Sequence, residues 1–429
     1  MKIEPAAALV GDVAVPGVKS ISHRALLLGA IADGVSEIRN FDRAGDTQST
    51  VHALRTLGVT VEEPDVDVVR VHGVGLRGLQ APETTLDCGN AGTLMRLVAG
   101  ILVGQHGTFT LAGDDSLNAR PMERIAAPLR QMGARVETTD GHAPLTVHGG
   151  AKLRPISYAL PVASAQVKSC VLLAGLYAEA GPTVVVEHGA QTRDHTERML
   201  RAMGAQVQSS PRQASVWPVE RLEPVSLELP GDFSSAAPLL VAATLLAGSE
   251  LRIHGVNLNP TRTGLLDVLA RMGARITIFN RRTIAGERAG DIDVRSSELV
   301  ATAIGADEVP LLVDELPLFA LAAGMARGES IVEGAQELRT KESDRIATVT
   351  SALKGLGIRI AERDDGFGVR GVPSRPKGGG MDSAGDHRLA MLGAVAGLVS
   401  REGVDVEGAE VIAISFPGFF DLLESVTRR

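Results

Sequence analysis

The feature that most constrains the fold of this chain is a short pattern that recurs five times. In each copy an amphipathic stretch such as LRTLGVTV or LRQMGARV reaches a glycine, and residues typical of strands follow. The five glycines are Gly58, Gly133, Gly204, Gly273 and Gly357. A glycine can adopt the positive φ that ends a helix, so each copy predicts a helix, a turn and a strand. The regular spacing, roughly 70 to 85 residues, indicates repeated structural units.

A second, more apolar stretch accompanies each copy of the pattern. Stretches of this kind occupy residues 22–34, 91–104, 164–181, 233–248, 316–328 and 386–400. Helices that are apolar on every side are buried ones. The chain therefore reads as six units of about 70 residues, each with one buried helix, one amphipathic helix and several strands.

The sixth unit is cut short, because its amphipathic helix, residues 417–429, reaches the end of the chain without a following strand. We expect the strands at residues 1–5 and 12–17 to complete it. This predicts a discontinuous domain of residues 1–18 and 227–429 and a second domain of residues 19–226. With three units in each, both are predicted to be α/β domains in which sheets surround three buried helices.

Composition excludes several classes of protein. The formal net charge of -8 argues against a general role on nucleic acids or membrane surfaces. Apolar segments such as residues 236–248 are shorter than the roughly 18 to 20 residues that span a bilayer. Two distant cysteines, Cys88 and Cys170, fit a reducing compartment, and we expect Cys170 in the core and Cys88 partly exposed. No secretory leader is visible, so the expected location is the cytoplasm.

Several of the predicted helices begin with basic residues, although a helix N-terminus favours acidic ones. The stretch PGVKSISHRALLLGA places Lys19, His23 and Arg24 where a helix favours acidic residues. One basic start fits a solvated surface, but a recurring set in an acidic chain favours a shared pocket for phosphates or carboxylates. Spacing of i,i+4 would place several polar and basic residues on common faces. The pairs are Ser20–Arg24, Ser164–Lys168, Arg120–Arg124 and Lys341–Arg345.

Acidic residues are mixed into the same segments, namely Asp314, Glu315, Glu342 and Asp386. Carboxylates beside cations in an anion pocket indicate proton transfer. The alternative interpretation makes Asp314 and Asp386 helix N-caps, and each could serve both purposes. The GVGLRG stretch at 73–78 matches a dinucleotide fingerprint but has no helix opening behind it. No metal-ligand cluster or phosphate-binding loop is visible in the sequence.

Together these motifs resemble the 5-enolpyruvylshikimate-3-phosphate synthase family. The motifs run in order along nearly the whole chain: PGVKSISHRAL, GNAGTLMR, NARPM, SAQVKS, TRDHTER, LVDELP, TKESDR, DHRLAM and SFPGF. The resemblance implies two inside-out α/β domains of three pseudo-repeats each, with buried parallel helices and outer sheets, joined by a double crossover. It also implies transfer of the enolpyruvyl group of phosphoenolpyruvate to the 5-hydroxyl of shikimate 3-phosphate, in chorismate and aromatic amino-acid biosynthesis.

The resemblance further implies the roles of individual residues. Catalysis would involve Asp314 as base, Glu342 as acid and Lys19. Shikimate 3-phosphate would be bound by Lys19, Ser20, Arg24, Ser164, Ala165, Gln166, Arg193, Asp314 and Lys341. Phosphoenolpyruvate would be bound by Lys19, Gly92, Arg120, Gln166, Arg345 and Arg388. The domain of residues 19–226 would serve mainly shikimate 3-phosphate, and the other domain would carry the catalytic groups.

The chain departs from some relatives at three positions. Ile414 stands where they have a lysine that contacts phosphoenolpyruvate, Glu337 where they have asparagine, and Leu97 where they have proline. The resemblance implies two small-molecule substrates, no metal or cofactor, no nucleic-acid or membrane partner, and a monomer.

Rival functions are distinguished by other residues. UDP-N-acetylglucosamine enolpyruvyl transferase shares the fold and donor, but it has asparagine where this chain has Ser20 and usually a cysteine where Asp115 stands. A non-catalytic two-domain anion-binding protein would carry a secretory signal and no acid–base carboxylates in its pocket. An RNA 3′-phosphate cyclase would share the repeat architecture only.

Overall fold

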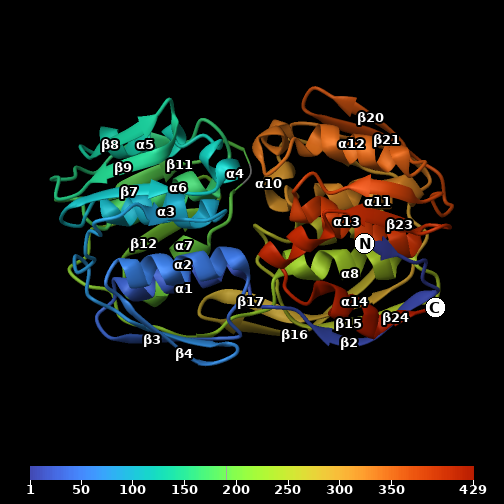
Figure 1. Ribbon diagram of the computed structural model, residues 1–429, viewed down its shortest axis with the longest axis horizontal. Helices are drawn as coiled ribbons and strands as arrows, with labels where there is room; N and C mark the ends of the chain where they lie inside the picture. Colours follow the sequence, from blue (N-terminus) through green and yellow to red (C-terminus); the bar gives the residue numbers. More distant parts are fainter. Residues whose placement is uncertain (190) are drawn as a thin grey trace. The chain divides into compact units, whose positions relative to one another are not determined.

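The computed structural model describes residues 1–189 and 191–429, which form two compact units (Figure 1). The middle unit comprises Gly17–Leu229 and the short segment Ile284–Glu287, and the terminal unit comprises Met1–Pro16, Pro230–Thr283 and Arg288–Arg429. The division falls within a few residues of the boundaries expected at 18/19 and 226/227. The grouping of Ile284–Glu287 with the middle unit was not anticipated.

The strands described in the middle unit form three sheets of the same design. Their orders are β14-β3-β5-β4, β6-β7-β9-β8 and β10-β11-β13-β12. In each sheet the first pair is parallel and the later pairs are antiparallel. The strands are β3 Val35–Arg39, β4 Thr60–Asp65, β5 Val68–His72, β6 Leu86–Asp87, β7 Thr108–Ala112, β8 Arg135–Thr139, β9 His142–His148, β10 Ser157–Ala159, β11 Thr183–Val186, β12 Val207–Ser210, β13 Gln213–Val216 and β14 Ser226–Glu228.

The helices of the middle unit follow the predicted alternation. Three are buried: α1 Lys19–Ala30, α3 Gly92–Leu102 and α6 Ala165–Gly175. The amphipathic helices are α2 Gly45–Thr56, α5 Glu123–Gln131 and α7 His195–Ala202, with the short α4 Asp115–Asn118 between α3 and α5. The glycines that follow α2, α5 and α7 have φ of +85°, +101° and +87°, as the repeat predicted. Between α3 and α6 the packing is so close that a Cβ on Gly100 would lie 2.3 Å from the Cys170 carbonyl oxygen.

The terminal unit uses a similar sheet design, but its described sheets have five, four and three strands. Its sheets run β16-β17-β15-β2-β24, β18-β19-β21-β20 and β1-β23-β22. The strands are β1 Lys2–Ile3, β2 Ala8–Ala14, β15 Glu250–Asn257, β16 Arg275–Ile284, β17 Glu287–Arg295, β18 Ala303–Ile304, β19 Gly328–Val332, β20 Arg359–Arg363, β21 Gly366–Gly371, β22 Gly379–Asp382, β23 Val404–Glu407 and β24 Thr427–Arg428.

The two N-terminal strands divide between two repeats, so one part of the expectation was wrong. Strand β1 pairs with β23 and completes the sixth repeat as expected. Strand β2 instead pairs in parallel with β15 and leads the sheet of the fourth repeat. In the middle unit the corresponding leading strand of the first sheet, β14, comes from the end of the segment. Each unit is thus closed by a strand that lies far away in sequence, and both chain ends lie in the terminal unit (Figure 1).

The helices of the terminal unit repeat the alternation. The buried helices are α8 Phe233–Leu245, α11 Leu316–Met325 and α13 His387–Val399. The amphipathic helices are α9 Gly264–Arg271, α12 Arg345–Gly355 and α14 Phe419–Val426, and the short elements are α10 Val309–Leu312, η1 Gln336–Thr340 and η2 Ala409–Ile414. The glycines after α9 and α12 have φ of +93° and +91°. The α/β architecture predicted from the repeats, with buried helices in both units, is confirmed.

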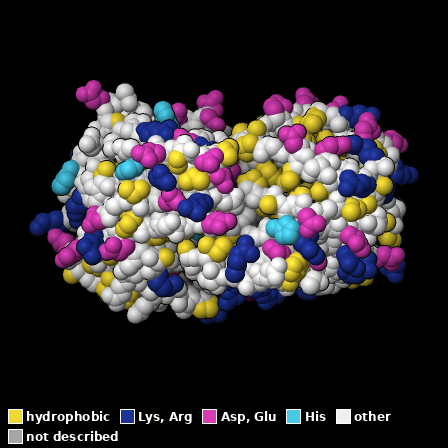
Figure 2. Space-filling view, turned by 90° about the horizontal axis from the view of Figure 1, so that it is seen from below, with side chains coloured by type: hydrophobic (Ala, Val, Ile, Leu, Met, Phe, Trp, Pro, Cys, Tyr) yellow, Lys and Arg dark blue, Asp and Glu magenta, His cyan; other side chains and the backbone are white. Residues whose placement is uncertain are grey.

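The surface mixes both signs of charge. On the face drawn in Figure 2, basic and acidic side chains are interspersed, and hydrophobic side chains are scattered among them. Over residues 1–189 and 191–429, no helix is both long enough and apolar enough to cross a membrane. Cys170 is buried as expected, whereas Cys88, expected to be partly exposed, is also fully buried.

Candidate functional site

The start of α1 pairs its cation with a carboxylate from another helix. Lys19 is the first residue of α1, and no acidic residue lies in the first turn of this helix. Its Nζ lies 2.7 Å from Oδ2 of Asp46, in the first turn of α2. The Lys19 side chain keeps 19% of its surface exposed. Lys19 is therefore held in place while part of it stays accessible.

Arg24 lies deeper in the same helix. Its guanidinium donates hydrogen bonds to Thr196 Oγ1 at 2.7 Å, to the Ser20 carbonyl oxygen at 2.8 Å and to Ser169 Oγ at 2.9 Å. Burial lowers the pKa of Arg24 to about 10; the nearby Glu197 opposes this shift and the positive charge of Arg193 adds to it. The direct partners of this guanidinium are neutral oxygens, so it holds a buried positive charge near the start of α1.

The starts of α3 and α6 meet at Gln166. Its side-chain oxygen accepts a hydrogen bond from Arg96 Nη1 at 2.5 Å, and its amide nitrogen donates to Thr93 Oγ1 at 3.0 Å. Ser164 is the N-cap of α6, where its Oγ accepts a long 3.4 Å bond from the backbone N–H of Val167. Ala165, the first residue of α6, offers its backbone N–H at the same helix start.

Two arginines converge beside the start of α3. Gly92 is its first residue, and a Cβ there would lie 3.3 Å from Arg120 Nη1 and 3.4 Å from Arg96 Nη1. Arg120 Nη2 donates to Asn90 Oδ1 at 2.9 Å and lies 3.3 Å from Ser116 Oγ. Gly92 and Arg120 were predicted from the sequence, whereas Arg96 was not, although it lies four residues after Gly92 in GNAGTLMR.

The expectation of i,i+4 helical faces was wrong for three of the four pairs. Lys168 is fully buried and pairs with two glutamates, so it cannot face an anion pocket. Arg120 precedes Pro121 and lies outside α5, which starts at Glu123. Lys341 caps the end of η1, whereas Arg345 begins α12. Ser20 and Arg24 do share one helix, and the Arg24 guanidinium donates to the Ser20 carbonyl oxygen.

Arg193 lies in the segment between β11 and α7. It is half-buried and directly precedes Asp194, the N-cap residue of α7. Because its positive charge contributes to the lowered pKa of Arg24, the two guanidinium groups belong to one region of the middle unit. This unit therefore gathers Lys19, Arg24 and Arg193 on or near two helix starts.

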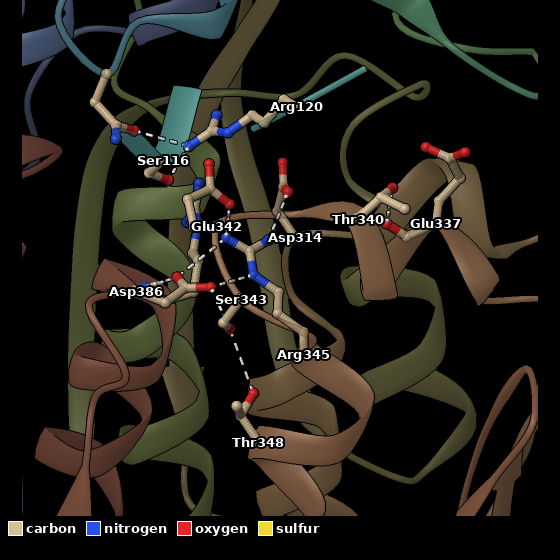
Figure 3. A network of polar contacts seen from close by, with 12 residues as sticks. Ser116, Arg120, Asp314, Glu337, Thr340, Glu342, Ser343, Arg345, Thr348 and Asp386 are labelled. Atoms are coloured by element: carbon tan, nitrogen blue, oxygen red, sulfur yellow. Dashed lines mark hydrogen bonds and ion pairs between the residues drawn. The ribbon is translucent and has the colours of Figure 1, made fainter. Parts of the chain in front are cut away.

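The terminal unit holds a different arrangement, in which three carboxylates surround Arg345 (Figure 3). Arg345 is 1% exposed and is the first residue of α12. Its Nε lies 2.7 Å from Asp386 Oδ2, its Nη2 lies 2.7 Å from Glu342 Oε2, and its Nη1 lies 3.3 Å from Asp314 Oδ1. Burial alone would lower the pKa of Arg345, but these carboxylates outweigh burial and raise it.

Asp386 and Asp314 differ as helix caps. Asp386 caps α13 by accepting the backbone N–H of Arg388 at 2.9 Å, so its expected role as an N-cap is confirmed, and it also binds Arg345. Burial would raise the pKa of Asp386, but Arg345 holds it below the ordinary value. The cap interpretation of Asp314 was wrong, because Glu315 occupies the N-cap position of α11. Asp314 instead keeps 15% of its side chain exposed beside Arg345.

The acidic cluster extends through a second buried arginine. Glu315 is fully buried and lies 2.6 Å from Arg262 Nη1, and it accepts a 2.6 Å hydrogen bond from Ser234 Oγ. Arg262 Nη2 lies 3.6 Å from Asp314 Oδ2, so Asp314 faces two guanidinium groups. Glu315 was named from the sequence, whereas Arg262 was not.

The remaining predicted residues of this unit lie close in sequence to the cluster. Lys341 and Glu342 occupy the turn between η1 and α12, and both are half-buried. Arg388 is the second residue of α13, and its Nη1 lies 3.4 Å from the Ser234 carbonyl oxygen. Ile414 ends η2, and Glu337 lies in η1. Since Asp314 and Glu342 both contact Arg345, this cluster can accept and donate protons beside a fixed positive charge.

Neither a metal site nor a dinucleotide site is found where the structure is described. Within residues 1–189 and 191–429 no group of three or more His, Cys, Asp or Glu side chains is placed to hold a metal ion. Residues 73–78 follow β5, and the next helix in this described part of the chain is α3, which starts at Gly92. The glycine fingerprint therefore lacks the helix that it needs.

The family comparison covers almost the whole chain. The family model described as EPSP synthase (3-phosphoshikimate 1-carboxyvinyltransferase) matches residues 3–423. A curated 3-phosphoshikimate 1-carboxyvinyltransferase from Acidithiobacillus ferrooxidans is 49% identical over 417 residues, which cover 97% of this chain and 95% of that protein.

Solved structures resemble the whole chain as well. EPSP synthase from Acinetobacter baumannii superposes with a TM-score of 0.88 at 42% identity, over 99% of this chain and 97% of that one. The enolpyruvyl transferase NikO from Streptomyces tendae gives a TM-score of 0.78 at 19% identity, over 99% of this chain and 96% of that one. The second likeness concerns the fold alone.

Proposed function

Since the chain belongs to the EPSP synthase family and is a transferase of the shikimate pathway, we propose how its own residues carry out that transfer. The enolpyruvyl group of phosphoenolpyruvate passes to the 5-hydroxyl of shikimate 3-phosphate, and phosphate is released. The observation that carries this assignment of roles is the contact of Asp314 and Glu342 with one buried guanidinium, that of Arg345. A base and an acid held by one cation suit a reaction that takes one proton and gives another.

We assign shikimate 3-phosphate mainly to the middle unit. Lys19, Arg24 and Arg193 supply positive charge for its phosphate and carboxylate. The hydroxyls of Ser20 and Ser164, the Ala165 backbone and the Gln166 amide supply neutral hydrogen bonds at the starts of α1 and α6. Lys341 of the terminal unit serves the hydroxyl groups of the ring. The 2.9 Å and 2.7 Å bonds that fix Arg24 support this role, because they orient its guanidinium before ligand arrives.

We assign phosphoenolpyruvate to arginines of both units. Arg120 offers its Nη1 edge beside Gly92, where the absence of a side chain leaves room for a close anion. In the terminal unit, Arg345 and Arg388 supply the remaining positive charge. The Nη1 contact of Arg345, at 3.3 Å, is longer than its Nε and Nη2 contacts with Asp386 and Glu342, so this edge is the one assigned to substrate. Lys19 and Gln166 contact both substrates in this scheme.

The chemistry then follows as addition and elimination. Asp314 takes the proton of the 5-hydroxyl, whose oxygen attacks C2 of phosphoenolpyruvate. Glu342 gives a proton to the methylene carbon, so a tetrahedral intermediate with a methyl group forms. Phosphate then leaves, and one methyl proton returns to the Glu342 carboxylate, which restores the double bond. The cations Lys19 and Arg345 stabilise the charge that develops. They are in place before the reaction, and such preorganised charge is usually the largest single contribution to rate enhancement.

The remaining parts of the proposal concern partners and location. We infer that the chain acts as a monomer in the cytoplasm, without a cofactor, a metal, a nucleic acid or a membrane partner. On the face drawn in Figure 2 the basic and acidic side chains are interspersed, which supports only the absence of a nucleic-acid partner on that face, because nucleic-acid binding calls for a clustered basic patch.

The test is release of phosphate by the purified protein from phosphoenolpyruvate and shikimate 3-phosphate, with EDTA present and no nucleotide added. A parallel reaction replaces shikimate 3-phosphate with UDP-N-acetylglucosamine, the acceptor of the rival transferase. We expect release in the first reaction only. The variant Glu342→Gln should lower kcat by about 10²-fold or more, the range typical of a lost acid or base. Release in the second reaction only would overturn the acceptor assignment.

The same assay tests the non-catalytic alternative. An anion-binding protein without catalytic function would bind shikimate 3-phosphate in a calorimetric titration yet release no phosphate in either reaction. The matched control is Lys152→Met, since Lys152 is an exposed residue of the middle unit with 89% of its side chain accessible. This variant should release phosphate at the wild-type rate.

A further inference from the structure

Lys168 of α6 is a fully buried cation without an assigned role. Its Nζ lies 2.8 Å from Glu187 Oε1 and 2.8 Å from Glu197 Oε1, and it donates a 3.1 Å hydrogen bond to the Thr192 carbonyl oxygen. Burial alone would lower the pKa of Lys168, but attraction to Glu197 and Glu187 outweighs burial and raises it. The lysine is therefore charged at neutral pH. Burying charged groups of this kind costs desolvation free energy that their mutual attraction often fails to exceed, so stability alone does not explain their presence.

The partners of Lys168 fix the segment that carries Arg193. Glu187 follows β11 directly, and its Oε2 accepts the backbone N–H of Thr192 at 2.8 Å. The carbonyl group of the same Thr192 accepts from Lys168. Both ends of the segment between β11 and α7 are thus tied to one ammonium group. Arg193 is the next residue after Thr192, so its backbone position depends on these contacts.

The same turn of α6 joins the substrate-binding helix starts. The backbone N–H of Lys168 donates to the Ser164 carbonyl oxygen at 3.0 Å, one turn earlier in the helix. The next residue, Ser169, accepts a hydrogen bond from Arg24 and lies 2.7 Å from Thr196 Oγ1 in α7. Two adjacent residues of α6 therefore connect it with α1 and with the first turn of α7.

We propose that Lys168 is a positioning residue for shikimate 3-phosphate. It sets the spacing between Arg193 and the polar groups at the start of α6, Ser164 and Gln166. This inference rests on the proposed role of those three residues as ligands. Because the Lys168 side chain is 0% exposed, it does not touch the substrate, and its effect passes through Glu187 and the Thr192 backbone.

The test is steady-state kinetics of Lys168→Met with both substrates varied. Loss of positioning removes binding that is equal in the ground state and transition state, so KM rises while kcat is kept. We expect KM for shikimate 3-phosphate to rise about tenfold, the change that 1.4 kcal/mol of binding free energy makes. KM for phosphoenolpyruvate and kcat should stay within about twofold. Lys168→Arg, which keeps the charge, should bring KM most of the way back.

Controls separate positioning from folding. Circular dichroism and thermal melting show whether each variant folds, and Lys152→Met is the matched exposed lysine, paired with Glu179 at 3.8 Å. If Lys168→Met does not fold, Glu187→Gln takes its place, since its amide oxygen can still accept from Thr192 while the negative charge is lost. Glu187→Gln should raise the same KM.

Two results would overturn the proposal. One is a folded Lys168→Met, or its Glu187→Gln substitute, with an unchanged KM for shikimate 3-phosphate. The other is a rise in the KM for both substrates together with a fall in kcat of similar size, which would indicate a structural role only. Failure of the proposed function is distinguishable, because the wild-type protein would then release no phosphate from these substrates at all.

Discussion

Two buried arginines, one in each unit, have opposite surroundings. Arg24 of the middle unit donates to neutral oxygens, and its pKa is lowered to about 10 by burial. Arg345 of the terminal unit binds carboxylates, and its pKa is raised. Arg24 is the sixth residue of the buried helix α1, whereas Arg345 is the first residue of the amphipathic helix α12. One fold can therefore hold a buried guanidinium either among neutral oxygens or among carboxylates.

The largest expected effect is a difference in the free energy of unfolding that is lost when each of these two arginines is replaced. Arg345→Met leaves Asp314, Glu342 and Asp386 near one another without their shared cation, which should cost about 3–5 kcal/mol of unfolding free energy. Arg24→Met removes a buried charge whose partners Ser169 and Thr196 still bond each other, so the cost should be about 1–2 kcal/mol. Urea denaturation followed by circular dichroism measures both. Equal losses would break the comparison.

A pH effect should be specific to the middle unit. His23 of α1 is 1% exposed, with Nδ1 2.7 Å from Thr50 Oγ1. Burial lowers the pKa of His23 to about 3; Asp46 opposes this shift, and Lys19 and Arg24 add to it. Below pH 6.5 the unfolded chain binds a proton that the folded chain does not, so stability falls as the pH drops from about 6.5 toward 3. Between pH 7 and pH 5 the loss should be about 2 kcal/mol.

The single tryptophan, Trp217, belongs to the middle unit, so its fluorescence during urea denaturation reports on that unit. The comparison is the wild type against His23→Gln, each at pH 7 and pH 5. The pH-dependent part assigned to His23 should vanish in the variant. In the terminal unit the pKa of Asp386 is lowered, so the stability it contributes is present above about pH 4 and is lost only below that. An identical pH response in His23→Gln would contradict the assignment.

The smallest effects concern two helix caps. Asp344 caps α12 with two bonds of 3.1 Å, to the N–H groups of Ile346 and Ala347, so Asp344→Ala should cost about 1 kcal/mol. Ser164 caps α6 with one bond of 3.4 Å, so Ser164→Ala should cost less than about 0.5 kcal/mol. Kinetics should show the reverse order, with KM for shikimate 3-phosphate raised more by Ser164→Ala. A larger stability loss in Ser164→Ala would mean that this serine serves the helix rather than the substrate.

The sequence was sufficient to predict the repeats and the buried helices. The five glycines and the all-apolar stretches are local signals, and local signals specify φ and burial directly. The partner of β2 was harder to predict, because its pairing with β15 joins residues far apart in the sequence and leaves no local signal. Only the packing of the whole unit selects its partner.

The polar network was predictable only in part. The sequence analysis named Arg345, Glu342 and Asp386, and the structure brings them together. It assigned Lys168 to an anion-facing surface, which was wrong because α6 is buried nearly all round and spacing cannot tell its faces apart. It also missed Asp46, the partner of Lys19, because a contact between two helices leaves no periodic signal in the chain.

The most direct test of the division between a binding unit and a proton-transfer unit is one pair of measurements on Glu342→Gln. Calorimetry gives the Kd for shikimate 3-phosphate, and phosphate release gives kcat. We expect a Kd within about twofold of wild type and a kcat lower by about 10²-fold or more, because Glu342 would act on the proton and not on the bound anion. A Kd weakened about tenfold with kcat preserved would contradict it, since Glu342 would then be a binding residue.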